Sequence, residues 1–429
     1  MNKSLKTPTC ALTAVVPVLG ERANLDRLLP DVKQALDALG VTWEVVVVNA
    51  SPSDGFEAAA AAHGARYFRE TDGGYGAAVT RGVFEAEGEY VLTMDPDAAE
   101  VESAVRALWN GREGYDVVVA SRYVDGAQVD QPRLRNFLSR AINRFFSKVL
   151  STPVKDLSTG FRLYRKEVFR HIEVETASLA FLLETLLKCF GNGILTVEVP
   201  FHYRLHEYRL AQAHGLKLGL ECFRGLFRLW RMRNSVKCAD YDIRAFDSRI
   251  FLQRYWQRTR YNIIMGFAEG DAFTLDAGCG SGRIIADLPN AVGVDIRHDK
   301  LRFMRRLNSR LAQANGLKLP FPDETFDCVI SSEVIEHIPE EDGRFIDELT
   351  RVLKPGGTLV LSTPDYGTWT WPLIEWLYYK VAPNAYAHEH VTHYSLKSLG
   401  EALEARGYEI QGHGYICRSD LVYKARKRA

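Results

Sequence analysis

The chain has 429 residues, more than the roughly 250 to 300 that one hydrophobic core usually organises, so we expect two domains. Its 46% hydrophobic and 25% charged residues exclude wholesale disorder, and the balance of 54 basic against 54 acidic residues argues against nucleic acid as a partner. The seven cysteines are scattered without a C-x-x-C pair, which indicates neither structural zinc nor a disulfide framework and fits a cytoplasmic protein best.

The first half of the chain alternates predicted strands with predicted helices. Short, continuous apolar runs bounded by turn residues are typical of parallel strands that are buried on both faces. Between the first two runs, residues 23–39 have apolar side chains three and four positions apart, which predicts a helix. This alternation indicates an α/β, doubly wound sheet. The predicted strands lie within residues 11–20, 43–51, 64–71, 88–95 and 115–123.

Two aspartates, Asp95 and Asp97, stand where the fourth of these predicted strands ends. The carboxyl ends of strands form the ligand-binding edge of open α/β sheets, and side chains two positions apart in an extended chain point the same way. The pair can therefore bracket one Mg²⁺ or Mn²⁺ ion whose shell is completed by the phosphates of a nucleotide diphosphate. Taken alone, D-P-D is more simply a solvated acidic turn.

Two stretches interleave basic with apolar residues, at 133–150 and 219–233. Helices of this composition can lie at a membrane surface, with the apolar face in the headgroup region and the cations against anionic lipid. Nucleic-acid binding and ordinary core packing are the alternatives. Because the chain contains no run of about eighteen uncharged apolar residues, we expect any membrane contact to be peripheral, at the inner face of the cytoplasmic membrane.

A second series of strands and helices begins after the periodicity lapses near residues 230–247, and we place the domain boundary between residues 235 and 236. Gly278, Gly280 and Gly282 directly follow a predicted strand, so the backbone can turn tightly against a ligand that faces a helix N-terminus. Asp295 ends the next strand, where a carboxylate can accept hydrogen bonds from both ribose hydroxyls. A glycine turn with a capping aspartate is the simpler alternative. The predicted strands lie within residues 273–283, 291–297, 326–338 and 357–364.

Three segments of this half closely resemble class I S-adenosylmethionine-dependent methyltransferases, in the branch of the ubiquinone-pathway O-methyltransferases: DAGCGSGR, LPFPDETFDCVISSEVIEHI and LTRVLKPGGTLVLSTP. The resemblance runs from about Phe273 to Ile410 and implies a Rossmann-like domain at residues 236–429. It also implies the residues that contact the cofactor. These are Asp276, Gly278 and Gly280 at the methionine portion, Asp295 and Ile296 at the ribose and adenine, Ser332 and Glu333 beside the cofactor, and Asn315, whose amide oxygen can accept from the adenine amino group where the family often has an acid.

Histidines are the candidates for the acceptor side of this domain. Methylation of a hydroxyl needs a proton acceptor, and His337, just beyond the strand that holds Ser332, is the predicted catalytic base. A structural histidine that caps a turn is the alternative. In AHEHVTHYS, the resemblance makes His388, His390 and His393 part of an acceptor pocket, although such a cluster can also bind a metal.

Five segments of the first half together resemble family 2 glycosyltransferases of GT-A fold, close to dolichyl- or polyprenyl-phosphate mannose synthases: AVVPVLGERANLDRLLP, EVVVVNASPSDG, GGYGAAVTRGVFEAEGEYVLTMDPDA, ASRYVDG and VKDLSTGFRLYRKEVF. The resemblance implies a glycosyltransferase domain at residues 1–235, with a nucleotide sugar as donor. It implies Asp95 and Asp97 as metal ligands, Asp97 also as a catalytic residue, Pro17, Glu21, Val47 and Asn49 around the nucleoside, Gly76 and Arg204 at the nucleotide sugar, and Arg122, Arg135 and Ser139 at an acceptor phosphate, with Arg122 counted as catalytic.

The first half departs from that family at two places. Asn49 and Ala50 stand where the family usually has an acidic pair, and the family's R-x-x-G-x-S-K segment appears as HYRLHEYRLAQAHGLK, in which Arg204 alone carries over. A phosphate acceptor is already ionised, so it can attack the anomeric carbon without a general base. We therefore nominate no catalytic base in this half.

The two halves together predict a bifunctional enzyme. The first would transfer a hexose with inversion from a nucleotide sugar to a polyprenyl phosphate or a glycan, using Mg²⁺ or Mn²⁺. The second would use S-adenosylmethionine to methylate an oxygen, most simply on the sugar product. The alternative is an active methyltransferase whose first domain is degenerate and serves as a glycolipid-binding module.

Overall fold

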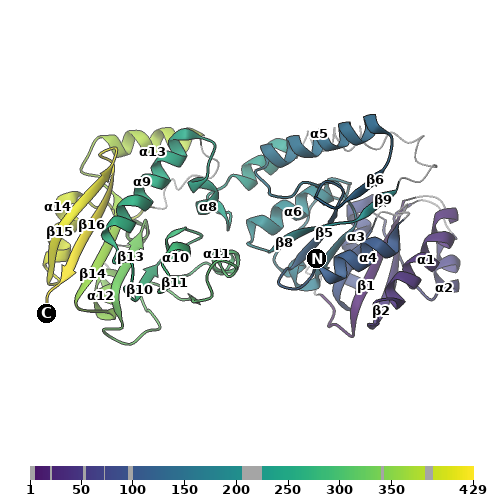
Figure 1. Cartoon of the computed structure of the whole chain (residues 1–429), viewed down its shortest axis with the longest axis horizontal. Helices are drawn as coiled ribbons and strands as arrows, with labels where there is room; N and C mark the ends of the chain where they lie inside the picture. The colour runs from purple at the N-terminus through teal and green to yellow at the C-terminus, as the bar shows by residue number, and fades with distance from the viewer. Residues whose placement is uncertain are drawn as a thin grey trace. The chain divides into compact units, whose positions relative to one another are not determined.

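The structure is a computed structural model that describes residues 5–19, 22–51, 55–71, 73–94, 100–204, 225–339, 343–381 and 390–429, without the side chains of 22–24 and 377–381. The chain divides into two compact units, Met1–Arg233 and Asn234–Ala429, and each contains one seven-stranded sheet (Figure 1). This confirms the predicted pair of doubly wound α/β domains. The exact boundary between residues 235 and 236 remains a prediction.

The sheet of the first unit has the strand order β3-β2-β1-β4-β7-β5-β8. Strands β2, β1 and β4 are parallel to one another, and β7 runs antiparallel to both β4 and β5. The order reverses between β1 and β4, and this switch point is where open α/β sheets bind ligands. The strands are β1 (Cys10–Val18), β2 (Trp43–Asn49), β3 (Arg66–Arg69), β4 (Gly88–Thr93), β5 (Val117–Ser121), β7 (Arg162–Arg165) and β8 (Thr196–Pro200), while β6 (Gln128–Asp130) and β9 (His202–Arg204) pair separately.

Helices cover both faces of this sheet, because successive strand residues belong to opposite cores. Val15 packs in one core with α3 and α6, whereas Ala14 and Val16 pack in the other with α1, α2 and α4. Helix α5 is mostly exposed, because only Asn143 and Phe146 of its 17 residues are buried. The helices are α1 (Arg22–Asp37), α2 (Phe56–Ala62), α3 (Tyr75–Glu85), α4 (Val101–Asn110), α5 (Arg133–Val149) and α6 (Phe181–Gly191), with a 3-10 turn η1 at Lys166–Arg170.

The sheet of the second unit has the order β12-β11-β10-β13-β14-β16-β15. Its first five strands are parallel, and β16 runs antiparallel between β14 and β15. The order reverses between β10 and β13, which places the second switch point at the ends of these strands. The strands are β10 (Thr274–Ala277), β11 (Ala291–Asp295), β12 (Leu311–Gln313), β13 (Phe326–Ser332), β14 (Leu353–Pro364), β15 (Tyr408–Ile416) and β16 (Asp420–Lys427).

Two cores again lie on the two faces of this sheet. Helices α12 and α14 contribute to one core, and α9, α10 and α11 contribute to the other. Across the part of the chain that the structure describes, every helix is too short or too polar to cross a membrane. The helices are α8 (Tyr241–Phe246), α9 (Phe251–Phe267), α10 (Ile284–Asp287), α11 (His298–Met304), α12 (Arg344–Val352), α13 (Thr370–Val381) and α14 (Leu396–Glu404), with a 3-10 turn η3 at Ile335–His337.

Candidate active sites of the two units

Two of the predicted donor-binding residues of the first unit lie near its switch point. Pro17 and Val47 are buried near the carboxyl ends of the neighbouring strands β1 and β2, so a ligand there would meet their backbone more readily than their side chains. Asp95 and Asp97 follow β4 but, like Glu21, lie outside the described residues. The metal site they would form therefore stays a prediction.

Asn49, at the end of β2, is fully buried and has a local role. Its Oδ1 accepts hydrogen bonds from the backbone N–H of Ser51 (2.9 Å) and from the Ser51 hydroxyl (2.8 Å), and its Nδ2 donates to the Tyr67 hydroxyl (3.1 Å). The amide thus fastens the turn after β2. Its predicted contact with a nucleoside stays a prediction.

Gly76 lies in the first turn of α3, against the segment before α6. A Cβ at this position would approach the Thr176 carbonyl oxygen to 2.3 Å and the Phe181 Cβ to 2.8 Å, so packing alone requires a glycine. Arg204, at the end of β9, is exposed, and its Nη1 is 3.9 Å from a carboxylate oxygen of Glu100. Neither observation tests their predicted contact with the nucleotide sugar.

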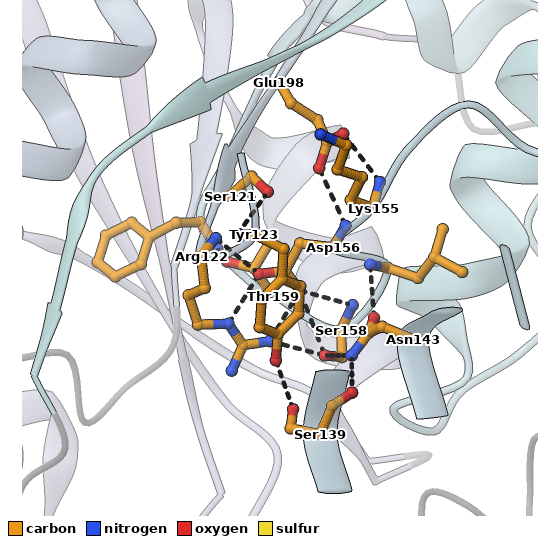
Figure 2. Close-up of polar contacts among 12 residues, drawn as sticks. Ser121, Arg122, Tyr123, Ser139, Asn143, Lys155, Asp156, Ser158, Thr159 and Glu198 are labelled. Carbon is orange, nitrogen blue, oxygen red and sulfur yellow. Dashed lines mark hydrogen bonds and ion pairs between the residues drawn. The ribbon is translucent and has the colours of Figure 1, made fainter. Parts of the chain in front are cut away.

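Arg122, the residue after β5, is held by a buried carboxylate that the sequence did not single out (Figure 2). Asp156 is completely buried and forms a bidentate ion pair with Arg122. Nε of Arg122 donates to Oδ2 and Nη2 donates to Oδ1, both at 2.7 Å. The Arg122 backbone N–H also donates to Oδ2 (3.0 Å), and Nη2 donates further to the Ser158 hydroxyl (2.7 Å). The direction of the guanidinium group is therefore fixed.

The ion pair shifts the pKa values of both groups. Burial favours the neutral form of Asp156, but the nearby Arg122 charge and its hydrogen bonds outweigh burial and lower the pKa of this carboxyl. Burial likewise opposes the charged form of Arg122, yet Asp156 raises the pKa of the guanidinium above its usual value. Both groups are therefore charged at neutral pH.

Helix α5 joins the same network (Figure 2). Asn143 donates to the Ser158 hydroxyl (3.1 Å) and to the Ser139 carbonyl (2.9 Å), while its Oδ1 accepts from the Leu157 backbone (2.8 Å). The Ser139 hydroxyl is 2.6 Å from the Tyr123 hydroxyl. The structure thus brings Ser139 into one network with Arg122. Among the described residues, Arg135, in the first turn of α5, forms no hydrogen bond or ion pair with that network.

The outer face of α5 is apolar and exposed. The large apolar side chains on this face are between 44% and 71% exposed. This favours the membrane interpretation over plain core packing for residues 133–149. The exposed side chains are those of Leu134, Phe137, Leu138, Ile142 and Phe145.

In the second unit, the predicted cofactor residues gather at the ends of β10 and β11. Asp276 is buried, and burial, followed by the charge of Asp295, raises its pKa to about 8. Asp295 Oδ2 accepts from the Gly280 backbone N–H (2.8 Å), so this carboxylate and the glycine turn lie together. At Gly278, with φ of 85°, a Cβ would lie 2.2 Å from Val334 Cγ2. A tight glycine turn beside two carboxylates fits the ammonium and ribose hydroxyls of S-adenosylmethionine.

Asp242 of α8, which no sequence motif singled out, also holds this turn. Its Oδ2 accepts from the Ser281 backbone (3.0 Å), the Ser281 hydroxyl (2.9 Å) and the Lys300 ammonium (2.8 Å). Burial opposes the charged carboxylate, but Lys300 and these hydrogen bonds lower its pKa overall. The glycine turn is therefore clamped from a helix that precedes β10.

Two further predicted cofactor residues are exposed. Ile296, directly after β11, is 64% exposed, so its side chain is available to pack against a flat adenine ring. Asn315 is exposed two residues after β12, and its Oδ1 accepts from the Leu317 backbone N–H (2.9 Å). The amide oxygen thus organises a turn, and its contact with adenine stays a prediction.

Beyond β13, a cluster of acids surrounds one arginine. Ser332 Oγ is 2.8 Å from Ser362 Oγ, and Ser362 donates to Glu333 (3.0 Å), whose φ of 57° is in the left-handed region. Arg260 of α9 donates to Glu333 (3.1 Å) and to the buried Asp420 (2.6 and 3.0 Å). Burial raises the pKa of Glu333 well above its usual range, although Arg260 opposes this.

His337 lies in η3 beside the predicted acceptor pocket. Its ring is 4.9 Å from that of His390, which is 2.8 Å from the Tyr366 hydroxyl, while His393 stacks on Tyr366 at 4.0 Å. Glu336 is fully buried, its Oε1 has no hydrogen-bond partner among the residues described, and burial raises its pKa to about 8. His388 lies outside the described residues.

Glu336, His337 and His390 could together hold a metal ion. One ligand atom from each lies within 4.8 Å of the others, and their nitrogen and oxygen donors suit a divalent transition metal. The structure thus brings two of the predicted histidines together and adds a carboxylate that sequence reasoning had passed over. The sequence indicated this carboxylate only through its position directly before His337.

Comparisons with known proteins find a matching family for each of the two units. Residues 13–173 match the model of glycosyl transferase family 2, and residues 275–361 match that of a methyltransferase domain. A dolichyl-phosphate hexose transferase of Haloferax volcanii is 31% identical over 194 residues, 45% of this chain and 82% of that protein. A dolichol-phosphate mannosyltransferase of Pyrococcus furiosus is 29% identical over 235 residues, 52% of this chain and 65% of that protein, just under two thirds of its length.

The second unit has its own relatives. A probable S-adenosylmethionine-dependent methyltransferase of Mycolicibacterium smegmatis is 30% identical over 171 residues, 37% of this chain and 61% of that protein. The two family matches fall in different units of the structure. The chain thus belongs to glycosyl transferase family 2 through its first unit and carries an S-adenosylmethionine-dependent methyltransferase domain in its second.

Proposed function

We propose that the chain is a bifunctional enzyme that first transfers a hexose from a nucleotide sugar to a polyprenyl phosphate and then methylates an oxygen of that sugar. One observation carries this proposal: a single chain contains a family 2 glycosyltransferase domain, related to a dolichyl-phosphate hexose transferase, and a methyltransferase domain. Joining two enzymes raises the effective concentration of the first product at the second site. A glycan acceptor is the other substrate class that the first site would serve.

In the first unit, the proposed reaction is carried by positioning and charge. Asp95 and Asp97 would hold Mg²⁺ or Mn²⁺ on the donor diphosphate, where a divalent ion neutralises the leaving group. The acceptor phosphate needs no base because it is already ionised. Arg122, fixed by Asp156 at the carboxyl edge of the sheet, would hold that phosphate in line with the anomeric carbon. The exposed apolar face of α5 supports peripheral contact with the inner face of the cytoplasmic membrane.

In the second unit, S-adenosylmethionine would supply an electrophilic methyl group. Asp276 would hold its ammonium group, Asp295 would accept from the ribose hydroxyls, and Ser332 and Glu333 would flank it. His337, a partly exposed histidine, would accept the proton that the sugar hydroxyl loses on methylation. His390 and His393 lie close enough to His337 and Tyr366 to line the same pocket.

A second function has one observation in its favour. The buried Asn49 amide is engaged by Ser51 and Tyr67 at a position where the family usually has an acid. A first unit that had lost donor binding would act as a glycolipid-binding module for an active methyltransferase. The intact Arg122–Asp156 pair is compatible with both functions, so the distinction needs a transfer assay.

Mass spectrometry of lipid products tests the proposal. The protein is incubated with polyprenyl phosphate, Mg²⁺ or Mn²⁺, S-adenosylmethionine and a panel of nucleotide sugars. We expect a product that gains one hexose and then one methyl group, and no hexose gain when the metal is chelated. Methylation of a supplied glycolipid without sugar transfer would establish the binding-module function instead.

A further inference from the structure

The hydrogen bonds of Arg122 leave one edge of its guanidinium group available. Its Nε–H and both N–H groups of Nη2 are taken by Asp156 and Ser158. Nη1 makes none of the hydrogen bonds found among the described residues, although the Arg122 side chain is only 11% exposed. In Figure 2, Nη1 points away from Asp156. Arg122 therefore offers the two N–H donors of Nη1, whose direction is fixed, to the oxygens of a phosphate, while its two-nitrogen fork is occupied by Asp156.

The charge of Arg122, by contrast, is already balanced. The completely buried Asp156 forms a bidentate ion pair with Arg122, so the pair as a whole is neutral. A phosphate monoester that approaches this pair meets hydrogen-bond donors but little net positive charge. Tight binding of a dianion then requires a second cation that no carboxylate neutralises.

Arg140 of α5 meets this requirement. Its guanidinium carbon lies 5.6 Å from the centre of the Tyr123 ring, and that of Arg122 lies 5.2 Å from the same ring. Within the described parts of the chain, Arg140 forms no ion pair, and it is exposed. Arg140 thus brings a positive charge, without a carboxylate partner among the described residues, to the same tyrosine ring that Arg122 contacts.

We propose that Arg140 and the Nη1 edge of Arg122 together bind the phosphate of the acceptor, and that Asp156 is the positioning residue that aims Arg122 at it. This inference rests on the proposed transfer to a lipid phosphate. It assigns the charge of the subsite to Arg140 and its direction to Asp156, roles that the family resemblance did not give to either residue.

The network around Asp156 supports the assignment because it also fixes α5. The Asp156 and Lys155 backbone N–H groups donate to Glu198 of β8 (2.9 and 2.8 Å), which anchors the carboxylate from the sheet. Asn143 of α5 donates to Ser158, which receives the Arg122 bond as well. A shift of Asp156 would therefore move Arg122 and α5 together. The phosphate subsite and the exposed apolar face of α5 are thus parts of one rigid arrangement, suited to a phosphate that carries an apolar chain.

Arg140→Gln tests the charge, and Arg144→Gln is its matched control. Both remove one exposed charge from the same helix, so a general loss of attraction to anionic lipid affects them equally. Sugar transfer is measured on the whole protein with a short-chain prenyl phosphate in neutral detergent. We expect Arg140→Gln to raise KM for the prenyl phosphate about tenfold, the worth of one charge-assisted hydrogen bond, with KM for the nucleotide sugar unchanged. Arg144→Gln should change neither value.

Asp156→Asn tests the positioning role. We expect it to raise KM for the prenyl phosphate and to lower kcat, with KM for the nucleotide sugar unchanged, and Asp156→Glu should restore part of the loss. Ser158→Ala keeps the ion pair and removes one acceptor, so it provides a milder version if Asp156→Asn does not fold. The inference would be overturned if Arg140→Gln and Arg144→Gln had equal KM values for the prenyl phosphate. It would also be overturned if the folded variants at positions 156 and 158 kept the acceptor kinetics of the wild type. Wild-type protein that transfers sugar to a glycan but not to prenyl phosphate would overturn both the inference and the proposed lipid acceptor, before any variant is compared.

Discussion

Asp295 shows how a single carboxylate can prepare a cofactor site. One oxygen accepts from the Gly280 backbone N–H (2.8 Å) and the other from the Arg297 backbone N–H (2.7 Å), so the side chain is already aimed before any ligand binds. Such preorganisation lowers the entropic cost of forming further hydrogen bonds to the ribose.

Replacing Asp295 with alanine should weaken S-adenosylmethionine binding by about 1.5 to 3 kcal/mol, because a charge-assisted contact to the ribose is lost. Titration calorimetry measures this directly. Asp299→Asn removes a nearby carboxylate that pairs with Arg297 and serves as the matched control. Equal affinity in the wild type and the Asp295→Ala variant would contradict the ribose assignment.

Asp276 makes the cofactor-free second unit sensitive to pH. Its pKa of about 8 in the folded protein exceeds the value near 4 of an exposed aspartate, so between these values the folded state holds a proton that the unfolded state lacks. Stability must then fall as pH rises through this window. Hydrogen exchange of peptides from β10 and β13 should show a loss of about 2 kcal/mol between about pH 6 and about pH 8.5.

The Asp276→Asn variant supplies the comparison for that experiment, since its amide does not titrate. Its exchange, compared with wild type at each pH, also removes the intrinsic pH dependence of the exchange reaction. We expect a smaller loss of protection in the variant. Identical losses in both proteins would mean that Asp276 is ionised throughout.

At this scale, the sequence identified residues that follow strands and missed those that act through distant partners. Asp276, Asp295 and Arg122 stand at strand ends, and their place at the sheet edge follows from parallel topology. Asp156 lies 34 positions from Arg122, and Asp242 lies 39 positions from Ser281, in stretches without periodicity that would bring them together. Only the folded chain reveals such pairs.

Among the elements, α5 exposes five large apolar side chains that an apolar environment would cover. Replacing both Phe137 and Leu138 with serine should reduce binding to vesicles of anionic phospholipid at least tenfold, since burial of each side chain contributes about 1.5 to 3 kcal/mol. Both side chains are more than half exposed, so the fold should persist. Sedimentation with vesicles is the measurement, and Ala141→Ser on the same helix is the control. Unchanged sedimentation of the double variant would remove α5 from the membrane interpretation.

Strands and helices could be predicted from the sequence where their burial produces a regular pattern of apolar residues. Strand β2 contains four consecutive valines that are buried alternately in two cores, so its apolar run was a clear signal. Strands β6 and β9 have three residues each and pair across more than seventy positions, which leaves no local pattern. Helix α9 has Ile264 as its single buried residue, so it lacks the apolar stripe by which helices are recognised.

For the whole molecule, two units with separate cores predict separable activities. Asp97→Ala should abolish metal-dependent sugar transfer and leave methyl transfer intact, although residue 97 lies outside the described part of the structure. Asp295→Ala should leave sugar transfer intact and lower methyl transfer at limiting S-adenosylmethionine, since it weakens binding of this cofactor. Both rates are measured on the same preparation. An unchanged glycosyl rate in Asp97→Ala would refute the metal assignment.

The clamp that Asp242 places on the glycine turn bears on how such enzymes can be recombined. The methyltransferase family match begins at residue 275, and a crossover at β10 would look natural from that match. It would nevertheless discard the carboxylate that holds Ser281 and Lys300. A portable methyltransferase cassette must start upstream of α8, and natural or engineered exchange of this module between fusion partners should respect that limit.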